Sequence, residues 1–494
     1  MGEHRPEPGP PPDRPSPSSS PPPSASPSAP PAPGASTSTG AGASSPSSRR
    51  GTGRRLPTDP GFWRSPLRGP WLTAVLGVVL LAGITVLLVT GLLSYAAYNP
   101  DLAPANDRTP DHGLLGFYLF SWPTEPHWLY RLTQGLHVTV GVVLVPVLLA
   151  KLWSVVPKLF TLPPARSLAH ALERISLLLL VGGVLFEFVT GLLNIQLDYL
   201  FPGSFYALHL YGAWVFASAF VVHVALRLPQ AVRILRAGAP RDLAAGGRRS
   251  ATAAEADART DIREPDLGTG LVAPRPAPPT LSRRGALGVV GGGSVLLLGV
   301  TVGQNADGPL RRTALLAPHG GPEPGEAGER GKGANVFQIN KTAAAVGVTA
   351  GETGDRWRLT VEGADGHKRQ LTRAALLAMP QHGAALPIAC VEGWSTSDQH
   401  WSGVRLRDLA ELAGYDPRAG LPGVFVDSLQ RSGAFRRAAL RDNQVRDPRS
   451  LLALRVGGED LSLDHGYPAR VIVPAAPGVH NTKWVTRLSF GADR

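Results

Sequence analysis

Cysteine is almost absent from this chain, in which Cys390 is the only one among 494 residues. A single thiol cannot form an internal disulfide, and it cannot build a zinc site of four cysteines. Both devices are therefore excluded. What remains for Cys390 is a choice between inert core filler and a special metal ligand, because a soft thiolate binds transition metals.

The N-terminal region has no apolar run. Residues 1–62 consist mainly of Pro, Ser, Ala and Gly. Such a segment cannot bury enough surface to offset the entropy of ordering, so we expect a disordered tail. We also expect no cleavable signal peptide, since that signal needs an apolar stretch near Met1.

Acidic residues are outnumbered, with 37 Asp and Glu against 49 Lys and Arg and a net charge of +12. The arginines gather beside apolar stretches and not on one compact domain. This pattern is typical of the cytoplasmic loops of membrane proteins and argues against nucleic-acid binding. The arginines concerned are Arg49, Arg50, Arg54, Arg55, Arg64 and Arg68, and later Arg233, Arg236, Arg241, Arg248, Arg249, Arg283 and Arg284.

Five apolar stretches approach the length of about 20 residues that crosses a bilayer. They lie at about 71–95, 132–153, 174–195, 205–227 and 286–303. The positive-inside rule puts the N-terminus in the cytoplasm and everything after residue 303 on the outside. We predict an all-α membrane bundle of four helices over 63–230, an Arg-rich cytoplasmic loop over 231–284 and a fifth, anchoring helix over 285–303.

Two short motifs recur in the same order. Val89-Thr-Gly-Leu-Leu93 returns as Val189-Thr-Gly-Leu-Leu193, and Gly-Leu-His137 parallels Ala-Leu-His209. Chance is one explanation, because apolar sequence reuses few residue types. We favour the other, a duplicated unit of two helices.

Histidines inside apolar spans are costly and usually functional. His209 and His223 are separated by about four helical turns, so both project from nearly the same face. His137 is expected at the depth of His209, and two neutral imidazoles can hold one haem iron. We therefore predict a haem b between His137 and His209, the alternative for each being an ordinary hydrogen bond between helices.

A second haem is less well specified. The repeat places Lys151 opposite His223, which leaves His170 as the other candidate ligand. Helix count and histidine spacing over about 70–230 resemble the di-haem cytochrome b family of quinone-linked membrane subunits. The resemblance implies one or two haems and exchange with membrane quinone. Glu187 is expected either to relay protons or contact quinone, or to pair within the bundle.

Two adjacent arginines precede the fifth stretch, in Leu281-Ser-Arg-Arg-Gly-Ala-Leu287. They could be a simple topology anchor. The motif also resembles a twin-arginine export signal, which is read by a receptor that exports folded domains. A domain that is loaded with its cofactor in the cytoplasm would need that machinery.

After a predicted tether at 304–334, residues 335–494 have the composition of a soluble domain. Strand-like runs (357–361, 423–426 and 470–473) alternate with short helices such as 406–412, which predicts a mixed α+β domain. Four ordered blocks resemble the sulfite-oxidase superfamily of molybdopterin oxidoreductases. They are Pro387-Ile-Ala-Cys-Val-Glu-Gly-Trp394, Trp401-Ser-Gly-Val-Arg-Leu-Arg-Asp-Leu409, Asp464-His-Gly-Tyr-Pro-Ala-Arg-Val-Ile-Val-Pro474 and Thr482-Lys-Trp484.

The resemblance implies a molybdenum–molybdopterin cofactor with the Cys390 thiolate as metal ligand. It also implies that Asn340, His465, Arg470 and Lys483 contact the cofactor, arginine being suited to bidentate phosphate contacts. Arg405 is expected to reach the phosphate or the substrate pocket.

Two departures from sulfite oxidases argue against sulfite as the substrate. Val391-Glu-Gly-Trp394 replaces the usual Asn-Arg-Arg run after the cysteine, and the sequence ends shortly after Lys483. Both features resemble the bacterial periplasmic branch typified by methionine-sulfoxide reductase subunits.

The hypothesis is a membrane-bound oxidoreductase that exchanges electrons between a small extracytoplasmic substrate and quinone through haem b. An external redox partner remains open. One alternative is a cofactor-free binding module on a membrane anchor, and another is a molybdoenzyme whose helices carry no haem.

Overall fold

The computed structural model describes eight stretches of the chain. The predicted tail 1–62, most of the Arg-rich loop 231–284 and most of the predicted tether 304–334 lie outside them. The described residues are 67–102, 120–156, 167–195, 205–237, 281–315, 333–363, 366–432 and 436–491.

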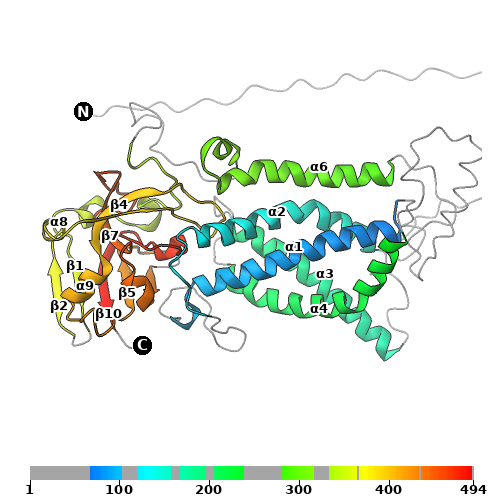
Figure 1. Ribbon diagram of the computed structural model, residues 1–494, viewed down its shortest axis with the longest axis horizontal. Coiled ribbons are helices and arrows are strands. Elements are labelled where there is room, and N and C mark those ends of the chain that lie inside the picture. The colour runs from blue at the N-terminus through cyan, green and yellow to red at the C-terminus, as the bar shows by residue number, and fades with distance from the viewer. Residues whose placement is uncertain are drawn as a thin grey trace, which may run out of the picture. The chain divides into compact units, whose positions relative to one another are not determined.

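Among the described residues, the N-terminal region contains five long helices (Figure 1). Each contains a stretch long and apolar enough to cross a membrane by length and composition. This is compatible with membrane insertion. The helices are α1 (Pro70–Ala97), α2 (Leu129–Val155), α3 (Leu168–Asn194), α4 (Tyr206–Arg236) and α6 (Arg283–Thr301).

The helices pack through apolar side chains. α1 lies against α2 and α4, and α3 lies against α4. Leu72, Leu144 and Phe216 belong to their shared core. α6 packs against α2, where the Ser294 hydroxyl donates to the Val143 carbonyl at 2.8 Å. α6 thus packs against the helix that carries His137.

Two β-sheets and short helices form the C-terminal domain (Figure 1). In the first sheet the order is β2-β1-β10-β5-β6, and only the β1–β10 pair among its described strands is parallel. This sheet consists of β1 (Leu359–Glu362), β2 (Lys368–Leu371), β5 (Val424–Ser428), β6 (Arg437–Leu440) and β10 (Val485–Phe490).

The second sheet has the order β3-β4-β7-β8, and β9 pairs with β7. Its strands are β3 (His382–Leu386), β4 (Gln399–Arg405), β7 (Leu451–Val456), β8 (Glu459–Asp460) and β9 (Arg470–Ile472). Side chains from both sheets, such as Leu359, Leu452 and Leu488, share one core. The short helices are α7 (Ala350–Thr353), α8 (Arg373–Ala378), α9 (Leu406–Leu412) and α10 (Asp442–Arg446), and the 3₁₀ turns are η1 (Pro100–Leu102), η4 (Val302–Gln304), η5 (Gly308–Thr313), η6 (Ala344–Val346) and η7 (Gly478–His480).

The predicted elements of this domain recur in the structure. The helix expected at 406–412 is α9, and the three strand-like runs overlap β1, β5 and β9. Apolar helices followed by a domain of mixed helices and strands are therefore confirmed.

The predicted tether differs from expectation at its beginning. Residues 304–313, called the strap below, form part of η4 and all of η5 and contact the loop that carries Cys390. The Ser395 amide donates to the Gln304 carbonyl at 2.9 Å, and Arg311 Nη1 donates to the Ser395 carbonyl at 2.6 Å. The composition rich in Gly and Pro indicated a loose linker, but these hydrogen bonds to Ser395 hold the strap against the loop that carries Cys390.

Buried hydrogen bonds join the helical region to the C-terminal domain. Asn99 Nδ2 donates to Gln444 Oε1 at 3.0 Å, and Trp122 Nε1 donates to the Ala475 carbonyl at 2.7 Å. Tyr98 and Ala389 share an apolar cluster at the same junction. The candidate site is thus assembled where both regions meet.

Candidate functional site

Cys390 lies in a tight loop between β3 and β4, residues 389–396, called the Cys390 loop below. The Cys390 amide donates to the Trp394 carbonyl at 2.8 Å, and the Gly393 amide donates to the Cys390 carbonyl at 3.1 Å. Gly393 has φ +85°, and a Cβ there would come within 2.4 Å of Val138 on α2. Glycine is required because the loop turns in the left-handed region and touches a helix.

A carboxylate is the nearest polar neighbour of the cysteine sulfur. Cys390 Sγ donates to Glu392 Oε2, which also accepts from Trp394 Nε1 at 3.1 Å. Both Cys390 and Glu392 are buried. Burial, followed by the charge of Glu392, raises the pKa of the Cys390 thiol well above its usual range. A thiolate here needs a compensating positive charge, which a metal ion supplies.

Five of the predicted cofactor contacts line one cavity of about 750 Å³. They are Asn340, Cys390, His465, Arg470 and Lys483. Asn340 Nδ2 lies 4.0 Å from Cys390 Sγ. Three of the four sequence blocks that resemble the molybdopterin enzymes, 387–394, 464–474 and 482–484, therefore converge in space.

The basic side of the cavity is deeply buried. Arg470 donates to the carbonyls of His465 and Asn481 at 3.1 and 3.0 Å, and Lys483 Nζ donates to the carbonyl of Asp464 at 3.0 Å. Burial lowers the pKa of Arg470 to about 9, and it lowers the pKa of Lys483 well below its usual range. Burial likewise lowers the pKa of His465 to about 4. An anionic ligand would offset the cost of these buried cations.

Several buried donors fit such a ligand. Arg470 Nε, Asn481 Nδ2 and Thr482 Oγ1 have no hydrogen-bond partner among the described residues, and all three residues line the cavity. Buried polar groups are rarely left unpaired in native proteins. Gly466, at φ +111°, leaves room beside them, because a Cβ there would come within 3.1 Å of the Arg470 and Lys483 side chains. Unpaired hydrogen-bond donors next to the cationic side chains of Arg470 and Lys483 suit a cofactor that carries a phosphate and a ring rich in hydrogen-bond acceptors.

Arg405 does not join this group. It is absent from the residues that line the cavity, and its Nε donates to Asp408 Oδ2 at 2.8 Å. Its position at the end of β4, just before α9, directs it to this ion pair.

The same cavity is also lined by His137 and His209. Their ring centroids are 6.2 Å apart and the rings are nearly perpendicular, at 88°. With metal–nitrogen bonds of about 2 Å and a ring radius of about 1 Å, two imidazoles that share one metal ion need a centroid separation of about 6 Å. The pair could therefore hold a haem iron.

Each of these histidines is oriented by the repeated motif. Thr90 Oγ1 lies 2.9 Å from His137 Nδ1, and Thr190 Oγ1 lies 2.9 Å from His209 Nδ1. A partner on Nδ1 leaves Nε2 as the nitrogen for a metal. The adjacent glycines provide space, since a Cβ at Gly91 would lie 3.2 Å from His137 Cε1. At Gly191 a Cβ would lie 3.3 Å from His209 Cε1.

The second predicted histidine pair stays a prediction, because only one of its two side chains belongs to the described residues. His223 lies on α4 but is absent from the cavity lining, and the side chain of His170 lies outside the described residues. Lys151 Nζ donates to the Thr73 carbonyl of α1 at 2.6 Å. Glu187 is buried, and its Oε2 lies 3.2 Å from His209 Nδ1.

The C-terminal part of the chain matches a known family. Residues 346–494 match the model of the oxidoreductase molybdopterin binding domain. This part of the chain is a molybdopterin-binding oxidoreductase domain. It is 33% identical over 135 residues to the uncharacterized oxidoreductase YuiH of Bacillus subtilis, an alignment that covers 27% of this chain and 65% of YuiH.

Eukaryotic sulfite oxidases are also similar to the domain. The mitochondrial enzyme of Drosophila melanogaster is 31% identical over 153 residues, covering 27% of this chain and 26% of that enzyme. The human mitochondrial enzyme is 30% identical over 158 residues, with 27% and 29% covered. The chain thus spans less than two thirds of the length of these relatives. Among solved structures, the sulfane dehydrogenase SoxCD of Paracoccus pantotrophus aligns with 24% identity and a TM-score of 0.25, covering 28% of this chain and 38% of that chain.

Sequence reasoning did not assign several residues of the site. Glu392 stands inside the quoted cysteine motif, so its position next to a metal ligand was the available signal. Thr90 and Thr190 were visible as repeats, but nothing in one sequence shows that each threonine meets the histidine of the next helix. Asn481 and Thr482 directly precede Lys483, and that proximity was their only signal.

Proposed function

We propose that this protein is a membrane-bound molybdopterin oxidoreductase that exchanges electrons between a small substrate and membrane quinone through haem b. The observation that carries the proposal is the single cavity that Cys390 and the His137–His209 pair both line. In one chain, a domain of the molybdopterin family thus shares a cavity with two histidines whose separation supports the haem proposal. Molybdenum supplies the two-electron chemistry when bound, and haem b carries electrons singly.

The residues near Cys390 have distinct roles in this proposal. Cys390 is the metal ligand, while Arg470, Lys483, Asn481 and Thr482 bind the cofactor's anionic and polar groups. Asn340, 4.0 Å from the sulfur, faces the position of the metal.

A neutral oxygen donor such as a sulfoxide fits the site better than sulfite does. Glu392 is buried beside the metal ligand, and its carboxylate repels an anionic substrate. For a sulfoxide, two electrons and two protons enter, the sulfur–oxygen bond breaks, and sulfide and water leave. Oxidation of one quinol to quinone releases the same two electrons and two protons.

The charge distribution supports an extracytoplasmic position for the domain. Arginines at the end of α4 and at the start of α6 mark the cytoplasmic side under the positive-inside rule. Arg283 and Arg284 would also engage the twin-arginine export machinery, which transports folded, cofactor-loaded domains. The cell membrane, with the N-terminus inside, is the proposed location.

Replacing the metal ligand tests this function directly. In Cys390→Ser we expect quinol-dependent sulfoxide reduction to fall by at least about a thousandfold, because the thiolate ligand is lost while haem binding is untouched. Dithionite-reduced minus oxidised spectra should stay at wild-type amplitude. Turnover at the wild-type rate in Cys390→Ser would refute molybdenum chemistry at this site.

Two measurements separate the proposal from its alternatives. Elemental analysis of purified protein should give molybdenum close to one per chain, whereas a cofactor-free binding module would give none. Reduced-minus-oxidised spectra should show a haem b Soret shift that is lost in His137→Ala with His209→Ala. Molybdenum without that Soret shift would leave an enzyme whose helices serve only as an anchor.

A further inference from the structure

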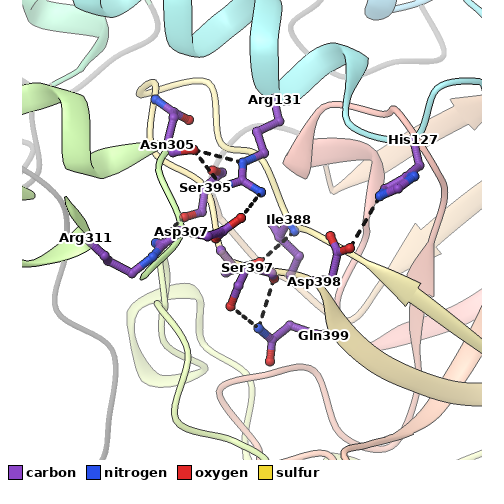
Figure 2. Close-up of polar contacts among 11 residues, drawn as sticks. His127, Arg131, Asn305, Asp307, Arg311, Ile388, Ser395, Ser397, Asp398 and Gln399 are labelled. Atoms are coloured by element: carbon purple, nitrogen blue, oxygen red, sulfur yellow. Dashed lines mark hydrogen bonds and ion pairs between the residues drawn. The ribbon is translucent and has the colours of Figure 1, made fainter. Parts of the chain in front are cut away.

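One face of the first turns of α2 contacts the Cys390 loop and the strap. Arg131, Gln134, Gly135 and Val138 recur at i, i+3, i+4 and i+7, which places them on one side of a helix. Arg131 donates to the Asn305 carbonyl at 2.6 Å and pairs with Asp307 at 2.9 Å (Figure 2). Asn305 in turn donates to the Gly393 carbonyl of the Cys390 loop. The strap therefore holds this loop against α2.

Small residues make the contact close. A Cβ at Gly135 would come within 2.6 Å of the Asn305 side chain, and a Cβ at Gly393 would come within 2.4 Å of Val138. A larger residue at Gly135 would require the Asn305 side chain to move, and one at Gly393 would require Val138 or the Cys390 loop to move. The backbone next to Cys390 is thus packed directly on the helix that carries His137.

Gln134 makes a direct hydrogen bond between α2 and the Cys390 loop. Its Nε2 donates to the Val391 carbonyl at 2.6 Å, and its Oε1 accepts from the Ser94 hydroxyl of α1 at 2.8 Å. The side chain is buried, with 8% exposed. Both ends of its amide are occupied, so the side chain has one defined orientation.

We propose that Gln134 is a positioning residue that fixes the route by which electrons pass between the haem held by His137 and the Cys390 loop. This inference rests on the proposed function. The route runs from Cys390 to Val391, across one hydrogen bond to Gln134, and along less than one turn of α2 to His137. Electron tunnelling weakens steeply with distance and more steeply across empty gaps than along bonds, so a fixed, bonded route favours rapid transfer.

The second half of the repeat lacks this connection. Tyr206 stands three residues before His209, as Gln134 stands three residues before His137. The ring of Tyr206 stacks on the ring of Tyr98, with 4.8 Å between the ring centroids, and Tyr206 makes no corresponding hydrogen bond to the Cys390 loop in the described contacts. The asymmetry assigns the route to the His137 side of the haem.

Flash photoreduction of the full-length purified protein tests the proposal without any knowledge of the substrate. A photoexcited deazaflavin delivers one electron to the haem, and haem reoxidation is followed by absorbance while molybdenum(V) is followed by electron paramagnetic resonance. In Gln134→Leu, which keeps the bulk but removes the donor, we expect reoxidation to slow by about tenfold or more, because small displacements of reacting centres have large effects on rate. Ser94→Ala removes only the hydroxyl that orients Gln134. It should also slow haem reoxidation, but by a smaller factor than Gln134→Leu does.

Asn443→Leu is the matched control. Its Nδ2 donates to the Trp122 carbonyl at 2.9 Å, so it removes an amide hydrogen bond of the same junction away from the Cys390 loop. We expect its rate to stay within about twofold of wild type, and all variants to keep wild-type haem spectra, haem midpoint potential and molybdenum content. Wild-type rates in both Gln134→Leu and Ser94→Ala would overturn the inference and leave the proposed function standing. Wild-type protein without haem would overturn both.

Discussion

At the scale of single residues, His480 is a buried titratable group that the proposed chemistry does not use. It is fully buried in η7, and neither ring nitrogen has a hydrogen-bond partner among the described residues. Its ring meets Tyr98 edge-on at 6.0 Å, at the junction of the two regions. Burial lowers its pKa from 6.5 to about 4.

This histidine predicts acid sensitivity. Between about pH 6.5 and pH 4 the unfolded chain binds one proton more at His480 than the folded chain, so the free energy of unfolding falls as pH drops through that window. Above pH 6.5 His480 does not make the free energy of unfolding depend on pH. The loss should reach about 1–3 kcal/mol, since one pKa unit corresponds to about 1.4 kcal/mol.

Thermal unfolding of His480→Gln from pH 7.5 to pH 4.5, followed by tryptophan fluorescence, checks this expectation. The midpoint of the variant should depend less on pH than that of wild type. His382→Gln is a suitable control, because His382 is only partly buried and lies near Asp408. An unchanged pH dependence in His480→Gln would contradict the assignment.

The individual residues also show what one sequence can predict. Cys390 and the basic cofactor contacts were predicted because ordered motifs carry them. Gln134 could not be predicted, since its partner is a backbone carbonyl 257 residues away. The role expected for Arg405 stays a prediction, and the ion pair of Arg405 with Asp408 was not foreseen because the motif does not show which acidic neighbour the arginine meets.

At the scale of elements, the duplicated helix pair gives each histidine the same support. Thr90 serves His137 and Thr190 serves His209, each from the neighbouring helix. The sequence showed both repeats, and apolar length predicted the helices close to their observed bounds. Which threonine meets which histidine depends on helix pairing, which only the packed bundle provides.

Removing these hydroxyl groups should weaken haem binding. For Thr90→Val and Thr190→Val we expect a loss of about 10- to 100-fold in haem affinity, the usual effect of removing a group that orients a metal ligand. Haem titration of the apoprotein, followed at the Soret band, measures it. Thr85→Val is the control, because Thr85 Oγ1 bonds only the Leu81 carbonyl of its own helix in the described contacts. Equal affinity for all three variants would show that the threonines do not orient the ligands.

At the scale of the whole molecule, the proposed location of the C-terminal domain depends on the arginines before α6. Ser282 caps α6, accepting from the Gly285 amide at 3.0 Å, and Arg283 and Arg284 occupy its first turn. Positive charge at a helix N-terminus is unfavourable for the helix dipole. A function other than helix stability therefore explains the pair, either topology or export.

Replacing both arginines by lysine separates these two functions. Arg283→Lys with Arg284→Lys keeps the charge, so a topology anchor should be unaffected, while export through the twin-arginine machinery should fall by about tenfold or more. Protease accessibility of a C-terminal tag in intact cells measures export. Arg233→Lys with Arg236→Lys, at the end of α4, is the control pair. Normal surface exposure of the first variant would refute the export signal.

The architecture of the molecule was predictable only in part. Apolar runs predict the helices, and the cysteine motif predicts the C-terminal domain. The docking of the Cys390 loop on α2 was not predictable, because it depends on close backbone contacts at Gly135 and Gly393 and on the strap, whose composition resembles a loose linker. Such contacts involve main-chain atoms and leave little trace in residue type.

Under the proposed function, the strap has a consequence for the rate of internal electron transfer. When the electron donor and the acceptor lie in one polypeptide and are held together, transfer between them is intramolecular. Its rate then does not depend on protein concentration. A pair of separate proteins that meets through opposite charges slows down as ionic strength rises. Here the internal electron transfer would be first-order, with a rate constant that is the same at low and high protein concentration and at low and high salt.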